Sequence, residues 1–219
     1  MIKGFIFDLD GVLVDTPKLH FAAWRKVAHS LGFDLNESQY EELKGLNREA
    51  SLIQILDWGN TKLSSQEFND LMVQKNEWYL EMTATMISDD ALPGVHEFLK
   101  AAKDLKLKIG LGSASQNARK ILDQVKMTNY FDVIIDGTQT TKSKPDPQVF
   151  EFGAKKLNLR PSSIVVFEDS KAGIKAAIDG GFKSVGIGAR KTLTAASVVY
   201  KGLHETSPLK VIEQFNFKS

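Results

Sequence analysis

The chain has 219 residues, 42% of them hydrophobic and 25% charged, ordinary values for a globular protein of one domain or of a core domain with a smaller insert. A formal net charge of +1 excludes the strongly basic surface that would favour nucleic acid or an anionic membrane. The absence of cysteine excludes disulfides, thiolate metal sites and a cysteine nucleophile.

The apolar run at the start of the chain is interrupted by Asp8, too early for a signal peptide. No stretch approaches the roughly 20 apolar residues that a membrane helix needs. We therefore expect a cytoplasmic protein with neither a membrane nor a nucleic acid as its partner.

Short apolar runs rich in β-branched residues predict buried strands. The predicted strands are 2–7, 108–111, 133–135, 164–167 and 184–187, and helical patterns occupy 94–105, 117–125, 147–157 and 170–179. Alternation of strand and helix predicts an α/β fold, with a Rossmann-like parallel sheet and helices on both of its faces.

The segment 16–88 interrupts this alternation, because it contains amphipathic helical patterns and no convincing strand. Thr16 is a good N-cap and Pro17 a good first helical residue. Ser64 and Glu67 form a capping-box pattern ahead of a later helix. The sequence therefore predicts an α-helical cap domain at 16–88, inserted into an α/β core made of 1–15 and 89–219.

Two carboxylates, Asp8 and Asp10, stand at the carboxyl end of the first predicted strand, where ligands bind in open α/β sheets. Gly11 is expected to turn the chain there, so that both carboxylates reach one pocket. Buried aspartates would be costly without a metal ion or a lysine to compensate them. A lone pair of aspartates is more often an acidic turn than a site, so the interpretation depends on the other strand ends.

Polar groups recur at the ends of later strands. Ser113 follows 108–111 and opens a loop, Lys144 precedes a helix, and Glu168 and Asp169 follow 164–167. Because the carboxyl ends of parallel strands meet at one edge, we expect these groups to converge. Each one alone has a structural explanation, as a turn residue, a surface lysine or a helix N-terminal acid.

The order and spacing of these motifs resemble the haloacid dehalogenase superfamily of phosphotransferases, over essentially the whole chain. The resemblance implies Asp8 as the nucleophile and Asp10 as the general acid/base, with Ser113 binding the phosphoryl group and Lys144 neutralising charge. It also implies Mg²⁺ as the cofactor. The implied metal-site residues are Asp8, Asp10 (through its backbone carbonyl), Glu168 and Asp169.

Elementary chemistry agrees with these implied roles. A phosphoryl group repels an anionic nucleophile, so a divalent ion and a lysine must bring the two together. Aspartate, with an ordinary pKa of ~3.9, is ionised at neutral pH and can attack phosphorus. The second carboxyl group must hold a proton for the leaving oxygen, so we expect its pKa to be raised in the closed site.

An aspartate at position 10 disfavours the dehalogenase and phosphonate-cleaving branches, which leaves phosphatase or mutase. The cap motifs at 20–24, 43–49 with Ser51, and 74–76 resemble the sugar phosphomutases of the family more closely than generic sugar phosphatases. The resemblance implies transfer between the 1- and 6-positions of a glucose phosphate through a bisphosphate, with a sugar-phosphate phosphatase as the alternative. The implied partner is a small sugar phosphate, and we expect a monomer.

The same resemblance implies further substrate- or phosphate-binding residues. Arg48 would grip the distal phosphate with help from the core loop, Lys75 would contact the sugar phosphate, and His20 would set the acid/base aspartate. The full predicted set is Thr16, His20, Trp24, Gly45, Leu46, Arg48, Ser51, Lys75, Ser113, Ala114, Ser115, Gln116, Asn117 and Lys144. Gln116 and Asn47 depart from the family pattern of lysine and serine, which puts the exact sugar in doubt more than the reaction. For Lys75, His20 and Trp24, plain roles in a solvated helix or the cap core stay open.

Overall fold

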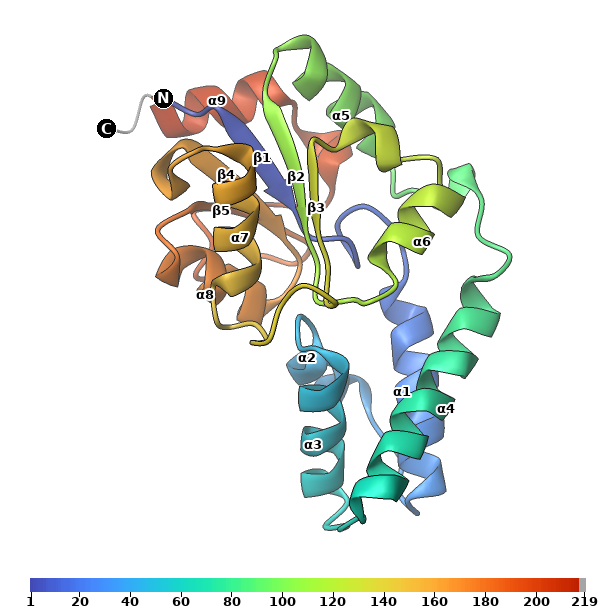
Figure 1. The fold of residues 1–219 in the computed structure, drawn as a ribbon. Coiled ribbons are helices and arrows are strands. Elements are labelled where there is room, and N and C mark those ends of the chain that lie inside the picture. The colour runs from blue at the N-terminus through green and yellow to red at the C-terminus, as the bar shows by residue number, and fades with distance from the viewer. Residues whose placement is uncertain (217–219) are drawn as a thin grey trace.

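A parallel sheet forms the centre of the computed structural model, which describes residues 1–216 (Figure 1). The strands are β1 (Gly4–Phe7), β2 (Lys108–Gly112), β3 (Val133–Ile135), β4 (Ile164–Glu168), β5 (Lys183–Ile187) and β6 (Val198–Tyr200). Their order across the sheet is β3-β2-β1-β4-β5-β6, and every neighbouring pair is parallel. The predicted α/β fold class is confirmed.

Helices cover both faces of this sheet (Figure 1). The core helices are α5 (Val95–Asp104), α6 (Ala118–Gln124), α7 (Gln148–Leu157), α8 (Lys171–Asp179) and α9 (Pro208–Asn216), with short 3₁₀ turns at Ser88–Asp90, Thr128–Tyr130, Pro161–Ser163 and Leu203–Glu205. Phe5 and Phe7 of β1 pack in one core cluster with residues of α5, α6 and α9, whereas Ile6 packs with α7 and α8. Because both faces of β1 are buried, its sequence is an apolar run without polar alternation.

The register of the central strands fixes the position of the motifs. Phe7 pairs with Leu111 of β2 and with Phe167 of β4, so the three strands end at the same level. From β1 the chain first adds β2 and β3 on one side of the sheet and then adds β4, β5 and β6 on the other, so the direction of the strand order changes at β1. Such a switch point is where open α/β sheets bind ligands.

Four helices lie beyond the carboxyl ends of the strands, away from the sheet (Figure 1). They are α1 (Pro17–Ser30), α2 (Glu37–Leu43), α3 (Arg48–Trp58) and α4 (Ser65–Thr83). The side chains of Asn36, Asn47 and Ser64 cap the N-termini of α2, α3 and α4, and the predicted Ser64–Glu67 capping box is confirmed. Thr16 stands at the N-cap position of α1, but its hydroxyl makes no capping bond.

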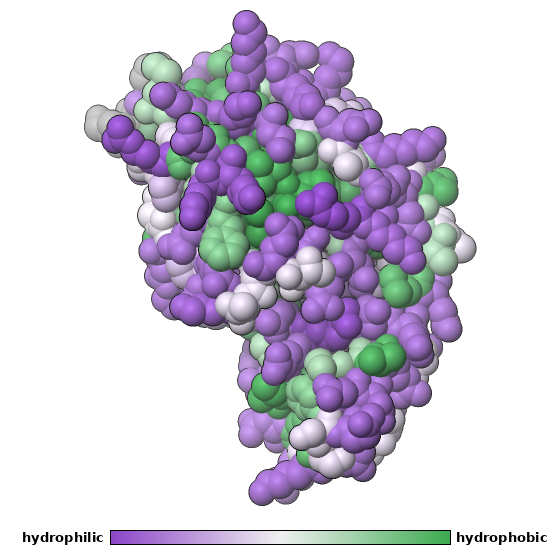
Figure 2. Space-filling model, in the orientation of Figure 1, coloured by the Kyte–Doolittle hydropathy of each residue, from purple (hydrophilic) through white to green (hydrophobic). Residues whose placement is uncertain are grey.

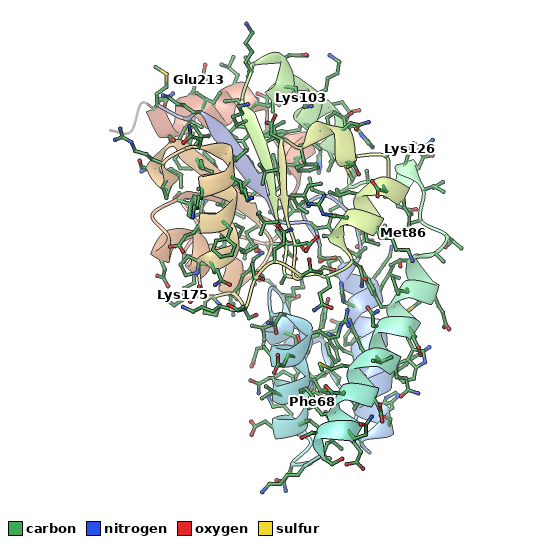
Figure 3. All side chains as sticks on the ribbon, viewed as in Figure 1. Phe68, Met86, Lys103, Lys126, Lys175 and Glu213 are labelled. Carbon is green, nitrogen blue, oxygen red and sulfur yellow. The ribbon has the colours of Figure 1, made fainter. Side chains whose placement is uncertain are left out.

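These four helices have a hydrophobic cluster of their own, which includes Trp24, Leu52 and Ile55. Phe68 on α4 packs against that cluster, whereas Met86, which follows α4, packs against the cluster of the sheet (Figure 3). We propose that residues 16–88 form a cap domain on a core of 1–15 and 89–219. None of the helices within residues 1–216 has the length and apolar content to cross a membrane.

The two chain segments that join this cap to the core run side by side. Val14 forms an antiparallel bridge with Ala91, and the Leu92 amide donates to the carbonyl of Leu13 over 2.9 Å. Gly11 has a φ of 78°, in the left-handed region, and its amide donates to the carbonyl of Val14. The expected turn after the aspartates is therefore present.

Candidate active site

The carboxylate of Asp8 lies beside a buried lysine at the end of β1. Lys144 Nζ donates to Asp8 Oδ1 over 2.7 Å and to Glu168 Oε1 over 2.5 Å. Burial opposes ionisation of Asp8 and holds its pKa well above the ordinary value, although Lys144 lowers it. Burial also opposes the charge on Lys144, but the carboxylates of Asp8 and Glu168 outweigh it and raise the pKa of Lys144. The lysine therefore stays protonated and offsets part of the negative charge around Asp8.

Glu168 belongs to the surroundings of Lys144. Its Oε2 accepts hydrogen bonds from the Ser170 amide over 2.9 Å and from the Ser170 hydroxyl over 2.8 Å, while Lys144 binds Oε1. Ser170 in turn accepts from the Gly173 amide and caps α8. Both oxygens of Glu168 thus have protein partners, and we propose that it serves the metal site indirectly, by holding Lys144.

Asp10 lies in a different environment, at the junction with α1. Thr16 donates its hydroxyl to Asp10 Oδ1, and His20 Nε2 lies 3.4 Å from the same oxygen. Burial raises the pKa of Asp10, but the charge of His20 and the hydrogen bond of Thr16 outweigh this and lower it. This direction is opposite to the raised pKa expected from the sequence. A lowered pKa keeps Asp10 ionised, so its carboxylate can accept a proton before it donates one.

A chain of contacts continues from Asp10 into the cap. His20 Nδ1 lies 3.0 Å from Lys75 Nζ, within hydrogen-bond distance. Lys75 also sits over the rings of Trp24, at 4.6 Å, and of Tyr79, at 5.0 Å. Burial, then the charge of Arg48, lowers the pKa of Lys75 to about 7. Trp24 therefore both packs in the cap core and supports the buried lysine.

Asp169 completes a cluster of negative charge at the carboxyl end of the sheet. Burial, then the charge of Glu168, raises the pKa of Asp169 to about 7, and Lys44 Nζ lies 3.5 Å from its Oδ2. Gly11 approaches Asp169 so closely that a Cβ on the glycine would overlap the carboxylate. Buried carboxylates that repel one another in this way are the environment that a divalent cation relieves.

The donor set suits Mg²⁺, which binds through oxygen and often uses only one or two carboxylates together with water. Within residues 1–216, no three acidic or imidazole side chains are gathered tightly enough to enclose an ion by themselves. Two carboxylates, Asp8 and Asp169, with the main-chain carbonyl of Asp10, would meet the need. We propose these three residues as the ones that hold the ion.

The loop 113–117 forms the second wall of the site. Ser113 is fully buried, its amide donates to Ile135, and its hydroxyl accepts from the Ser115 amide over 3.1 Å. The Gly137 amide donates to the Ser115 carbonyl, and a Cβ at Gly137 would overlap the carbonyl of Ala114. The turn after β3 therefore supports the predicted phosphate-binding loop from behind.

The cap presents Arg48 and its neighbours to this loop. Arg48 is the first residue of α3, and its Nη2 donates to Asn76 Oδ1 over 2.7 Å. Asn117 Nδ2, from the core, donates to the same oxygen over 2.9 Å. Burial lowers the pKa of Arg48, but a guanidinium remains charged at neutral pH. A cation of the cap and a polar loop of the core thus face each other.

A pocket lies between cap and core, and residues of both line it. Figure 2 shows hydrophilic residues on the visible face of this junction. Of the residues predicted from the sequence, the pocket is lined by Asp8, Asp10, His20, Trp24, Gly45, Leu46, Arg48, Ser51, Lys75, Ala114, Ser115, Gln116, Asn117 and Asp169. The other four, Thr16, Ser113, Lys144 and Glu168, lie behind the lining and are buried.

Several residues near the pocket were given no role in the site by the sequence analysis, although Leu43, Lys44 and Asn76 lie within its cap motifs. Pro17, Tyr40, Leu43 and Lys44 line it. Asn76, Ser143 and Ser170 contact residues of the site, and the first two directly neighbour Lys75 and Lys144 in the chain. That adjacency was the available signal. Tyr40 and Leu43 face the pocket from α2, and an amphipathic pattern cannot distinguish such positions from ordinary cap core.

Comparison with known proteins identifies the family of this chain. The model of the family described as haloacid dehalogenase-like hydrolase matches residues 5–187, and the chain belongs to this family. The family predicted from the motifs is thereby confirmed.

Individual relatives are more specific. The chain is 38% identical, over 91% of its length and 89% of the relative's, to a β-phosphoglucomutase of Bacillus subtilis. A crystal structure of a β-phosphoglucomutase from Clostridium difficile superposes with a TM-score of 0.95 at 38% identity, covering 99% of this chain and 98% of the other. A phosphorylated carbohydrates phosphatase of Thermotoga maritima is 31% identical over 84% of both chains.

Proposed function

We propose that this chain is a magnesium-dependent β-phosphoglucomutase. It would interconvert β-D-glucose 1-phosphate and β-D-glucose 6-phosphate through a phosphoaspartate on Asp8 and a glucose 1,6-bisphosphate intermediate. The observation that carries this proposal is the pairing of two sites for anions in one pocket. Asp8 and Lys144 provide the reacting end, and Arg48, facing the loop 113–117 across the junction, provides the other.

The chemistry at the reacting end divides between the two aspartates. In the forward direction, phosphorylated Asp8 transfers its phosphoryl group to the sugar 6-hydroxyl, whose oxygen forms the new P–O bond as the bond to Asp8 breaks. Asp10, with its lowered pKa, takes the proton of that hydroxyl. In the second half-reaction Asp8 attacks the phosphoryl group on the anomeric oxygen. The bond between phosphorus and that oxygen breaks, and Asp10 gives its proton to the oxygen. Bound Mg²⁺ would supply positive charge against the repulsion between carboxylate and phosphate.

The other end must hold whichever phosphate is not reacting. A bisphosphate presents a distal phosphate in both orientations, so one cation can serve both half-reactions. Arg48 has a neutral amide as its side-chain partner, which leaves its charge available to an anion. Closure of the cap over the pocket would also limit the access of water to Asp8, which favours transfer to a sugar over hydrolysis.

A hydrolase acting on a sugar phosphate is the second candidate, and the phosphatase relative of Thermotoga maritima supports it. The two functions differ in the acceptor, water or a sugar hydroxyl. A coupled assay with β- and α-glucose 1-phosphate should show glucose 6-phosphate formed from the β-anomer much faster than free phosphate is released. Release of free phosphate without any glucose 6-phosphate would establish the phosphatase instead.

Two variants test the assigned roles. Asp8→Asn should abolish both the mutase reaction and the hydrolysis of a small aryl phosphate, because both use the same nucleophile. Arg48→Ala should lower the mutase kcat/KM far more than aryl phosphate hydrolysis, because the aryl phosphate has no distal phosphate. Equal losses for Arg48→Ala in the two assays would refute its role.

A further inference from the structure

Asn76 occupies an unusual place for a neutral side chain, between two donors from different parts of the molecule. Its Oδ1 accepts from Arg48 Nη2 over 2.7 Å and from Asn117 Nδ2 over 2.9 Å. Asn76 lies on α4 and Arg48 on α3, both in the cap, whereas Asn117 stands at the start of α6 in the core. One oxygen atom therefore links the cap, the core and the guanidinium.

The neutrality of this acceptor has an electrostatic consequence. Within residues 1–216, the salt bridges of arginine are Arg25 with Asp34 and Arg119 with Asp136, and Arg48 has none. The Asn76 amide fixes the direction of the Arg48 guanidinium without cancelling its charge. A carboxylate in the same place would form an ion pair with Arg48 and repel a phosphate that approached it.

The hydrogen bond between Asn117 and Asn76 depends on the position of the cap. Asn117 can reach Asn76 only when the cap lies against the core, as it does in this structure. Its hydrogen bond therefore holds Asn76, and through it Arg48, in place in the closed arrangement. When the cap moves away, Asn76 loses one of its two partners and Arg48 is less constrained.

We propose that Asn76 is a positioning residue, which aims Arg48 at the distal phosphate and leaves the charge of the guanidinium whole. Its hydrogen bond with Asn117 makes this alignment depend on closure of the cap. The inference rests on the proposed function for the identity of the ligand, a sugar with two phosphates. Whatever the reaction, the preference of the pocket for a second phosphate should depend on Asn76 acting through Arg48.

The test measures binding, in the Asp8→Asn background, so that no phosphoryl transfer intervenes. Isothermal titration calorimetry on the full chain, in the same magnesium buffer for every variant, gives the Kd for glucose 1,6-bisphosphate and for glucose 6-phosphate, and their ratio reports the second phosphate. Asn76→Asp, which keeps the shape and adds a negative charge, should reduce the preference for the bisphosphate at least tenfold. Asn69→Asp, exposed on the same helix, makes the same change of charge and should leave the ratio as it was.

A double-mutant cycle shows whether Asn76 acts through Arg48. Asn76→Ala alone should lower the preference about three- to tenfold, the range expected for the net loss of one ordinary hydrogen bond. In the Arg48→Ala background the same substitution should change the ratio less than twofold. An equal effect of Asn76→Ala with and without Arg48, or an unchanged ratio in Asn76→Asp, would overturn the proposal.

This result is separable from the proposed function. If the chain with Asp8 intact forms no glucose 6-phosphate in the coupled assay, the mutase proposal fails while the binding ratios still decide the role of Asn76. If the Asp8→Asn protein has no preference for the bisphosphate at all, the proposal for Asn76 fails whatever the reaction is. Thermal unfolding of each variant shows that the fold is retained.

Discussion

The backbone amide of Asn47 in the cap donates to the hydroxyl of Ser143 in the core over 2.7 Å. Asn47 directly precedes Arg48, and Ser143 directly precedes Lys144, so this hydrogen bond joins the two cationic ends of the pocket through their chain neighbours. Closure of the cap is therefore favoured in part by contacts within the protein.

Ser143→Ala should weaken closure, because a hydrogen bond of this kind contributes about 0.5–1.5 kcal/mol net. We expect phosphorylated Asp8 to lose its phosphoryl group to water about 2–10-fold more often per transfer to sugar, as the same free energy implies. The measurement is the ratio of free phosphate to glucose 6-phosphate in the coupled assay. Ser162→Ala, at an exposed position of the core, is the matched control, and an unchanged ratio in Ser143→Ala would show that the contact has no part in closure.

Gly137→Ala should displace the loop 113–117, because a Cβ there would overlap the carbonyl of Ala114. The displacement moves Ser115 and Gln116, and misplacement of binding groups by about 1 Å can cost up to about a hundredfold in rate. We expect kcat/KM for the mutase reaction to fall about ten- to a hundredfold for this reason. Thr138→Ala, one residue further, lacks this overlap and serves as the comparison. Wild-type kinetics in Gly137→Ala would mean that the loop does not depend on the turn behind it.

Lys75 should make the stability of the protein depend on pH. Its pKa is about 7 in the folded protein, against about 10.5 for an ordinary lysine, because it is buried and faces the charge of Arg48, with Asp10 only partly opposing these. Between these two pH values the unfolded chain binds the extra proton, so the free energy of unfolding rises as the pH rises. Below pH 7 the buried charge opposes folding in full.

Lys75→Met should therefore stabilise the protein at pH 6 by a few kcal/mol, on the order of that charge-burial cost, and the gain should shrink toward pH 10. Urea denaturation at a series of pH values measures it. Lys62→Met, exposed in the cap, is the control for loss of a positive charge. A gain that is equal at pH 6 and pH 10 would contradict the assignment.

Magnesium should raise the temperature of unfolding, because it would bind the folded state alone and relieve repulsion between Asp8 and Asp169. Millimolar Mg²⁺ is expected to shift the midpoint upward by several degrees, and a chelator should reverse the shift. Asp169→Asn removes one proposed ligand and should abolish the shift, whereas Asp89→Asn, exposed in the segment after α4, should retain it. A shift of full size in Asp169→Asn would show that the ion binds elsewhere.

The sheet and the motif positions were predictable from the sequence because their signals are local. Strands buried on both faces have apolar runs, and the groups at their carboxyl ends must share one edge whatever the details of packing. Strand β6 and helix α9 were not predicted. Val198–Tyr200 is only three residues long and partly exposed, so it lacks the apolar run that identified the other strands.

The finer arrangement of the site depends on which side chains tertiary structure brings together. The Thr16 hydroxyl has a choice between capping α1 and donating to Asp10, and only the approach of Asp10 decides it. The same approach, with His20, lowers the pKa of Asp10, where sequence reasoning expected the opposite. The hydrogen bond between Asn76 and Asn117 spans 41 positions and two parts of the molecule, and no local pattern indicates it.

The bridge between Val14 and Ala91 brings the beginning and the end of the cap segment next to each other. An insertion whose two ends are adjacent adds a body of any size while leaving the neighbouring strands where they are, since its anchoring points need not move apart. Evolution can therefore exchange or reshape the cap, the part we propose to select the acceptor, while Asp8, the proposed nucleophile, keeps its position at the end of β1. For protein engineers, the same two positions are the natural junctions at which to graft the cap of a relative with a different acceptor.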